Sequence, residues 1–105
     1  MLRFIKNLFG GKKADVKALV TKGAIIVDVR TPREFQAGHL KGSINYPLDS
    51  LKQHFAELKK TQKPVITVCR SGARSGMGSN MLKDHGIEAY NGGSWDGLER
   101  KLGKG

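Results

Sequence analysis

The sequence predicts an α/β domain in which helices flank both faces of a mostly parallel central sheet. Two observations lead to this fold class. Short runs rich in β-branched residues alternate with segments of helical pattern, and the connections between them are short. The 105 residues are too few for two independent cores, so we expect one domain, with 38% hydrophobic residues to build its core.

Residues 1–13 differ in character from the domain that we expect over residues 14–105. Apolar side chains at positions 2, 5, 8 and 9 share one helical face opposite two cations, which predicts a basic amphipathic segment. Packing against the domain is one role for it. A weak contact between residues 2–9 and an anionic membrane surface is the alternative, although eight residues bury too little for firm attachment.

Four elements are expected between residues 14 and 46. A helix over residues 14–22 stops at Gly23, and the run 24–29 (AIIVDV) predicts a parallel strand covered on both sides. The next helix has Thr31 as its N-cap and Glu34 in position for a capping box, and it ends at Gly38. Residues 43–46 predict a brief strand.

The second half of the chain continues the alternation. Residues 48–60 predict a helix capped by Asp49 or Ser50, and residues 65–68 (VITV) predict a second buried strand. Residues 69–74 then form a loop before a helix over residues 75–85. The remaining elements are a strand at 87–90, a turn at 91–93 and a last helix that Ser94 caps and that ends near Leu102.

Charge and cysteine content limit the classes of function. Nineteen Lys and Arg against nine Asp and Glu give a net charge of +10, which favours anionic partners without choosing among them. The single cysteine excludes an intramolecular disulfide, and a lone thiol suits a reducing compartment. No run approaches the roughly 20 apolar residues of a membrane span, and Arg3 and Lys6 interrupt any signal-like stretch. We therefore expect a cytoplasmic protein.

Cys69 is the candidate nucleophile. It directly follows the predicted strand 65–68, and ligands of open α/β sheets bind beyond the carboxyl ends of the strands. Loop amides, the N-terminus of the next helix, and the charges of Arg70 and Arg74 would all favour thiolate over thiol. Gly72 allows the loop a left-handed turn. An ordinary buried cysteine is the alternative, and a thiol sealed in the core would exclude catalysis.

Four signatures in order then point to a known family. Residues 69–74 (CRSGAR) resemble the six-residue active-site loop of rhodanese-like sulfurtransferases. Upstream, residues 28–30 (DVR) with 34–35 (EF), and residues 38–47 (GHLKGSINYP), are similar to the two N-terminal signatures of that family. Downstream, Gly92-Gly93 with Trp95 is similar to its C-terminal one. The resemblance covers roughly residues 14–102 and implies a rhodanese-like fold.

The resemblance also implies a sulfurtransferase that needs no metal or organic cofactor. Cys69 would attack the sulfane sulfur of a donor such as thiosulfate, expel sulfite and carry the sulfur as a persulfide. Cyanide, a cellular thiol or a sulfur-accepting protein would then remove it. The residues that would bind the anionic donor are Arg70, Ser71, Gly72, Ala73 and Arg74. No nucleic-acid partner is expected, because no recognition motif accompanies the positive charge.

Residues around the loop are expected to support it. Asp28 should pair with Arg30 or Arg74 and hold the site in place, since a thiolate needs no general base. The chain departs from the family at Gly76 and Gly78, where the family often has alanine. Each such glycine costs about 1 kcal/mol in a helix unless close packing requires it. At position 71, Ser replaces a second cation, which leaves other sulfur donors open.

Two other functions remain as alternatives. A cysteine phosphatase or arsenate reductase uses the same strand, thiolate loop and helix, but such enzymes resemble Cys-x5-Arg. Here four residues separate Cys69 from Arg74, and the shorter ring suits a single sulfur atom better than a phosphate. A non-catalytic rhodanese-like binding module is the second alternative, and the retention of Cys69 and both arginines argues against it.

Overall fold

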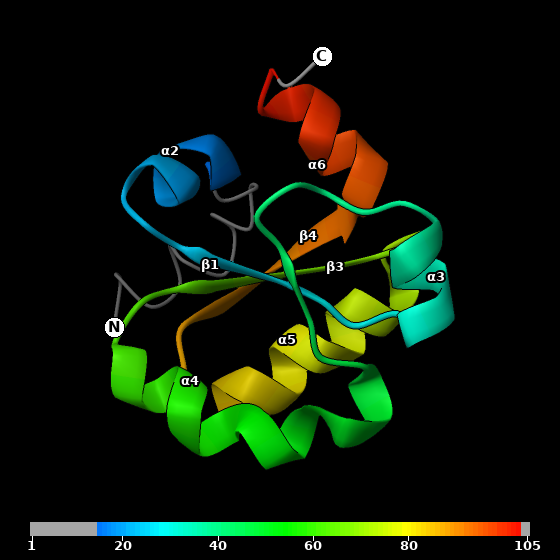
Figure 1. Ribbon diagram of the computed structural model, residues 1–105. Helices are drawn as coiled ribbons and strands as arrows, with labels where there is room; N and C mark the ends of the chain where they lie inside the picture. Colours follow the sequence, from blue (N-terminus) through cyan, green and yellow to red (C-terminus); the bar gives the residue numbers. More distant parts are fainter. Residues whose placement is uncertain (1–14, 104–105) are drawn as a thin grey trace.

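The computed structural model describes residues 15–103, which form a four-stranded parallel sheet between two layers of helices (Figure 1). The strands are β1 (Ile25–Asp28), β2 (Ile44–Asn45), β3 (Val65–Cys69) and β4 (Ala89–Ser94). They lie in the order β2-β1-β3-β4, and every neighbouring pair is parallel. The predicted fold class is confirmed.

Residues 1–14 and 104–105 lie outside the described part of the chain. The predicted amphipathic segment 1–13, the membrane contact of residues 2–9 and the domain start at residue 14 therefore stay predictions. Within residues 15–103, no helix combines the length and the apolar character that crossing a membrane requires.

The helices fall close to their predicted positions. They are α2 (Val16–Thr21), α3 (Pro32–Ala37), a 3₁₀ helix η1 (Leu48–His54) that leads into α4 (Phe55–Thr61), α5 (Ala73–Asp84) and α6 (Trp95–Lys101). Two predicted caps are confirmed. Thr31 and Glu34 form a complete capping box at the start of α3, and the Ser94 hydroxyl accepts a hydrogen bond from the Gly97 N–H at 3.2 Å at the start of α6.

The predicted cap of the helix at residues 48–60 is wrong. This segment begins as a 3₁₀ helix after Pro47, and no side chain caps it. The Ser50 hydroxyl donates to the Pro47 carbonyl at 3.3 Å, and Asp49 is exposed. The start of α5 also differs, because the helix begins at Ala73 rather than Ser75.

The predicted turn at residues 91–93 is wrong as well, because β4 runs through it. Thr67 of β3 pairs with Asn91, but Cys69 pairs with Ser94, so β4 carries an extra residue at Gly92-Gly93. A Cβ at Gly92 would lie 2.7 Å from the Ile66 side chain and 3.0 Å from the Thr67 carbonyl oxygen. The glycine pair thus permits a bulge and a close approach to β3.

Alternating residues of the strands face two apolar clusters. The first cluster lies under η1, α4 and α5, and its buried members include Val27, Val29, Leu51, Phe55, Leu58, Val65, Cys69 and Leu82. The second lies under α2 and α6, and its buried members are Val16, Ile26, Leu40, Ile66, Val68 and Leu98. Figure 1 shows these two helical layers on opposite sides of the sheet. This alternation turns the Cys69 side chain toward α5.

Gly78 lies on the buried side of α5 and is one of the two helix positions at which the family often has alanine. It is buried, and a Cβ there would lie 3.4 Å from Val29 Cγ1 and 3.5 Å from Leu51 Cδ2. These are ordinary van der Waals distances, so a Cβ would fit between the two side chains. Close packing therefore does not require glycine at this position, and nothing in the structure offsets its low helix propensity.

Candidate active site

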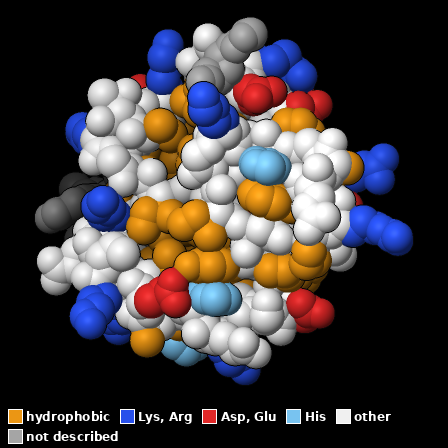
Figure 2. Space-filling model, viewed as in Figure 1, with side chains coloured by type: hydrophobic (Ala, Val, Ile, Leu, Met, Phe, Trp, Pro, Cys, Tyr) orange, Lys and Arg blue, Asp and Glu red, His pale blue; other side chains and the backbone are white. Residues whose placement is uncertain are grey.

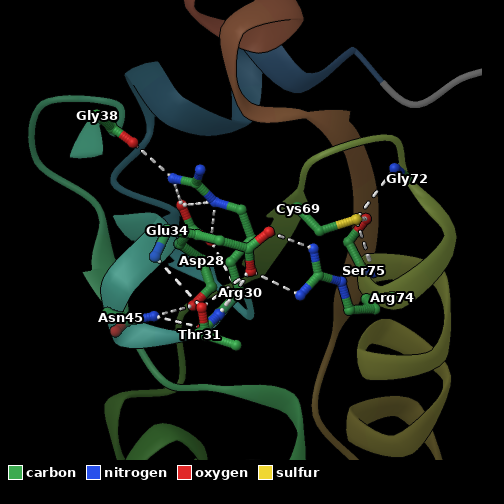
Figure 3. Close-up of polar contacts among 10 residues, drawn as sticks. All are labelled: Asp28, Arg30, Thr31, Glu34, Gly38, Asn45, Cys69, Gly72, Arg74 and Ser75. Atoms are coloured by element: carbon green, nitrogen blue, oxygen red, sulfur yellow. Dashed lines mark hydrogen bonds and ion pairs between the residues drawn. The ribbon is translucent and has the colours of Figure 1, made fainter. Parts of the chain in front are cut away.

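Cys69 ends β3 and lies beside the first turn of α5 (Figure 3). The strand therefore includes Cys69, which the sequence placed one residue beyond it. Only 1% of Cys69 is exposed. The thiol is therefore buried, and a reagent can reach the sulfur only if the residues around it move.

Donor groups from the start of α5 surround the sulfur. The Gly72 N–H donates to Cys69 Sγ at 3.0 Å and the Ser75 N–H donates at 3.3 Å, while the Ser75 hydroxyl oxygen lies 3.4 Å from the sulfur. The first N–H groups of a helix have no acceptor within the helix. Cys69 is the acceptor for two of them here, and the positive φ of Gly72, 102°, directs the loop toward the sulfur.

The pKa of the Cys69 thiol is lowered from its ordinary value. Burial raises this pKa, but hydrogen bonds from the Ser75 side chain and from the N–H groups of Ser75, Gly72 and Ser71 lower it by more. The direction agrees with the thiolate that the sequence predicts. The dipoles of the loop and of the first helical turn therefore favour the ionised sulfur.

Arg74 forms an ion pair with Glu34, a partner that the sequence analysis did not select. Its Nη1 and Nη2 donate to Glu34 Oε1 at 2.8 Å and Oε2 at 2.9 Å, and Figure 3 shows the guanidinium turned toward α3. The ion pair lowers the pKa of Glu34 to about 2 and raises the pKa of Arg74. The charge on Cys69 adds a smaller part of the rise in the Arg74 pKa. Glu34 is thus the ion-pair partner of Arg74, and the charge on Cys69 also acts on this guanidinium.

Three other residues that the sequence predicts to bind the donor are exposed at the surface of the loop: Arg70, Ser71 and Ala73. Arg70 is exposed, and it has no ion-pair partner within residues 15–103. Ser71 and Ala73 are also exposed, and neither side chain carries a charge.

Asp28 pairs with Arg30, one of its two predicted partners, and not with Arg74. Arg30 Nε donates to Asp28 Oδ1 at 2.9 Å and Nη2 donates to Oδ2 at 2.7 Å, and both side chains are buried. The same Nη2 donates to the Gly38 carbonyl at 2.7 Å, and the guanidinium lies 5.0 Å from the centre of the Trp95 ring. The pair therefore ties the end of β1 to residue 38 and to α6.

Ser75 and Asn91 are site residues that the sequence analysis did not select. Ser75 is fully buried and contacts the sulfur through both its N–H and its hydroxyl. Asn91 Oδ1 accepts from the Ser75 hydroxyl at 2.6 Å. The position of Ser75 in the first turn after the loop is a signal that could have identified it. Asn91 comes from β4, and no local pattern marks it.

The described residues offer neither a metal site nor a concentrated cationic surface on the face shown. Within residues 15–103, no group of three or more His, Cys, Asp or Glu side chains could hold a metal ion. Figure 2 shows the Lys and Arg side chains spread around the edge of this face, with acidic and apolar side chains between them. The Lys and Arg side chains on this face are thus distributed rather than collected in one patch.

Comparison with known proteins is consistent with this architecture. The family model of the Rhodanese-like domain matches residues 12–99. The chain is 44% identical over 69 residues to the uncharacterized protein YqhL of Bacillus subtilis and 33% identical over 61 residues to the thiosulfate sulfurtransferase PspE of Escherichia coli. These matches cover 65% and 57% of this chain, and 54% and 59% of the relatives. The chain thus spans somewhat more than half the length of these two curated relatives.

A solved structure, a rhodanese with anions from E. coli, resembles the fold with a TM-score of 0.65 at 29% sequence identity. The similarity covers 70% of this chain and 89% of that one.

Proposed function

The chain belongs to the Rhodanese-like domain family, and we propose that it is a sulfurtransferase that carries sulfur on Cys69. The observation that supports this most directly is the pair of N–H groups, from Gly72 and Ser75, that donate to the sulfur at 3.0 and 3.3 Å. Such donors stabilise negative charge on the thiolate. They would also stabilise negative charge on a persulfide held at the same position.

The proposed reaction has two steps. The Cys69 thiolate attacks the sulfane sulfur of thiosulfate, the S–S bond of the donor breaks, and sulfite leaves with the bonding electron pair. In the second step, cyanide or a thiolate attacks the outer sulfur of the persulfide. Thiocyanate or a new persulfide forms, and the electron pair of the broken bond returns to Cys69 as thiolate. The covalent intermediate divides one transfer into two easier ones.

Donor recognition is proposed to depend on Arg70 and the loop amides. Glu34 accepts one N–H of each terminal nitrogen of Arg74, whereas Arg70 has no ion-pair partner within residues 15–103, which favours Arg70 as the guanidinium for an anionic donor. A sulfur donor with a single negative charge, such as a persulfide, is therefore a candidate besides the thiosulfate dianion. The acceptor is proposed to be cyanide, a cellular thiol or a sulfur-accepting protein.

The burial of Cys69 favours a second candidate function, a Rhodanese-like domain used for binding without catalysis. With 1% of the residue exposed, attack on a donor requires the residues that cover the sulfur to open. The rate of alkylation by iodoacetamide measures this opening, because Cys69 is the only cysteine. Catalysis requires that reagents reach the thiol in the folded protein, so a catalytic domain should be alkylated while it is folded. A native thiol that reacts only after unfolding would favour the binding module.

Mass spectrometry of the intact protein after incubation with thiosulfate tests the reaction itself. The proposal predicts a gain of about one sulfur mass that disappears on adding cyanide, because only the thiolate accepts the sulfur. The Cys69→Ala variant should gain nothing. If the wild-type protein stays unmodified with both thiosulfate and a low-molecular-weight persulfide, the proposal is wrong.

A phosphatase or arsenate reductase receives less support from the site. Such an enzyme needs a guanidinium that faces a tetrahedral oxyanion held over the thiolate, and Arg74 is bound by Glu34 through both of its terminal nitrogens. Turnover of phosphate esters, with no sulfur gained from thiosulfate, would reverse this order of the candidates.

A further inference from the structure

Asn91 lies within β4 and contacts both structures beside the sulfur, the loop and the first turn of α5. Its Oδ1 accepts from the Ser75 hydroxyl at 2.6 Å and from the Gly93 N–H at 3.0 Å, and its Nδ2 donates to the Gly72 carbonyl at 3.1 Å. These partners determine the orientation of the amide. A flipped amide would direct hydrogens at the Gly93 N–H and an oxygen at the Gly72 carbonyl.

The helix leaves room for this side chain. A Cβ at Gly76 would lie 3.2 Å from Asn91 Nδ2, so an alanine there would press on the amide. Gly76 is one of the two positions at which the rhodanese-like pattern often has alanine. The absence of a side chain at Gly76 therefore leaves space for the Asn91 amide in this chain.

The Ser75 hydroxyl has one proton and two neighbours that can accept it. Ser75 Oγ lies 2.6 Å from Asn91 Oδ1 and 3.4 Å from Cys69 Sγ, in a residue that is fully buried. While Cys69 is a neutral thiol, its S–H donates to Ser75 and the Ser75 hydroxyl donates to Asn91, so all three groups are satisfied. Once Cys69 is ionised, the hydroxyl can serve either the sulfur or Asn91, but not both.

We propose that Asn91 is a positioning residue that competes with the Cys69 sulfur for the hydroxyl proton of Ser75 and holds the Gly72 carbonyl so that the Gly72 N–H faces the sulfur. This inference rests on the proposed function, because it gives Asn91 a part in preparing the Cys69 nucleophile. On ionisation the thiol proton leaves to solvent and the Ser75 hydroxyl rotates from Asn91 to the sulfur. Asn91 then keeps the Gly93 N–H as a donor.

A double-mutant comparison of Ser75→Ala and Asn91→Ala tests the competition. In the wild-type protein the Ser75 hydroxyl is shared, whereas in Asn91→Ala the sulfur becomes its remaining partner. Ser75→Ala should therefore raise the thiol pKa more in the Asn91→Ala background than in the wild type, by about half a pH unit or more. The ultraviolet absorbance of the thiolate as a function of pH reports this pKa, because Cys69 is the only cysteine. Equal shifts in the two backgrounds would overturn the proposal.

Asn91→Asp gives a second, independent test with a matched control. A carboxylate holds the Ser75 proton more strongly and cannot donate to the Gly72 carbonyl, so the thiol pKa should rise by about one unit or more. Asn80→Asp adds the same charge at an exposed position of α5 and should produce a smaller shift. The proposal is also overturned if the two shifts are equal, or if the Asn91→Asp shift is undiminished in Ser75→Ala.

The comparison of Asn91→Asp with Asn80→Asp tests the proposal if Asn91→Ala does not fold, and the double-mutant comparison tests it if Asn91→Asp does not fold. The titrations use no sulfur donor, so they remain readable if the protein transfers no sulfur. A protein that forms the persulfide but shows no coupling between Ser75 and Asn91 would refute only the role of Asn91.

Discussion

Replacing Gly72 by alanine tests the physical basis of the site most directly. Gly72 has a φ of 102°, and its N–H donates to Cys69 Sγ at 3.0 Å. A residue with a Cβ is strained by about 1–2 kcal/mol in the left-handed region. The variant therefore has two ways to respond: it keeps the loop conformation and bears the strain, or it relaxes the loop and withdraws the N–H from the sulfur.

The two responses differ in what they change. If the loop keeps its conformation, the free energy of unfolding falls by about 1–2 kcal/mol and the thiol pKa stays lowered. If the loop relaxes, the thiolate loses a hydrogen bond worth about 1.5–3 kcal/mol, so the thiol pKa rises by roughly one to two units. We expect the two effects to trade off, with a clear change in at least one of them.

Urea unfolding and titration of the thiolate absorbance measure the two quantities on the same protein. Gly23→Ala is the matched control, because Gly23 has a similar φ of 98° and a Cβ there would meet nothing within 4 Å. That variant should lose stability and keep the thiol pKa. If Gly72→Ala changed neither the stability nor the thiol pKa, the loop conformation would not be what holds the N–H against the sulfur.

Three further outcomes are expected. The pKa of Glu34 is lowered from 4.5 to about 2, with the Arg74 hydrogen bonds as the largest cause, so this pair stabilises the fold fully above pH 4.5 and loses its effect as the pH falls toward 2. Glu34→Gln should therefore flatten the fall of the melting temperature over that range, and an unchanged pH profile would contradict the pairing. Gly92→Ala should lower the free energy of unfolding by about 1–3 kcal/mol, because its Cβ would lie 2.7 Å from the Ile66 side chain; equal urea midpoints would show that β4 relaxes freely. Leu82→Ala removes a fully buried side chain of α5 and should cost about 2–5 kcal/mol in the same assay, while Met77→Ala, at a position 53% exposed on that helix, should change little.

The strands and most helix ends were predictable because their signals are local. The β-branched run before Asp28 and the run before Cys69 became β1 and β3, with Cys69 within one residue of its expected place. The capping box of α3 involves residues three positions apart, so it can be recognised without the rest of the fold.

The glycine pair at residues 92 and 93 shows where local signals end. A turn and a β-bulge both favour glycine, because both use backbone conformations with positive φ. Composition alone therefore could not distinguish them. The pairing of Cys69 with Ser94 shows that the glycines form a bulge, and this register depends on how β4 pairs with β3.

The sequence by itself determined the α/β class, the order of the elements and the position of the lone thiol at the carboxyl edge of the sheet. Only the tertiary structure decided which hydrogen-bond and ion-pair partners lie around the thiol. Glu34 binds Arg74 across 40 residues of chain, and Asn91 reaches Ser75 across 16. Hydrogen bonds and ion pairs form over about 3 Å. Their partners are therefore chosen by strand register and helix packing, which bring distant segments together and leave no trace in local sequence patterns.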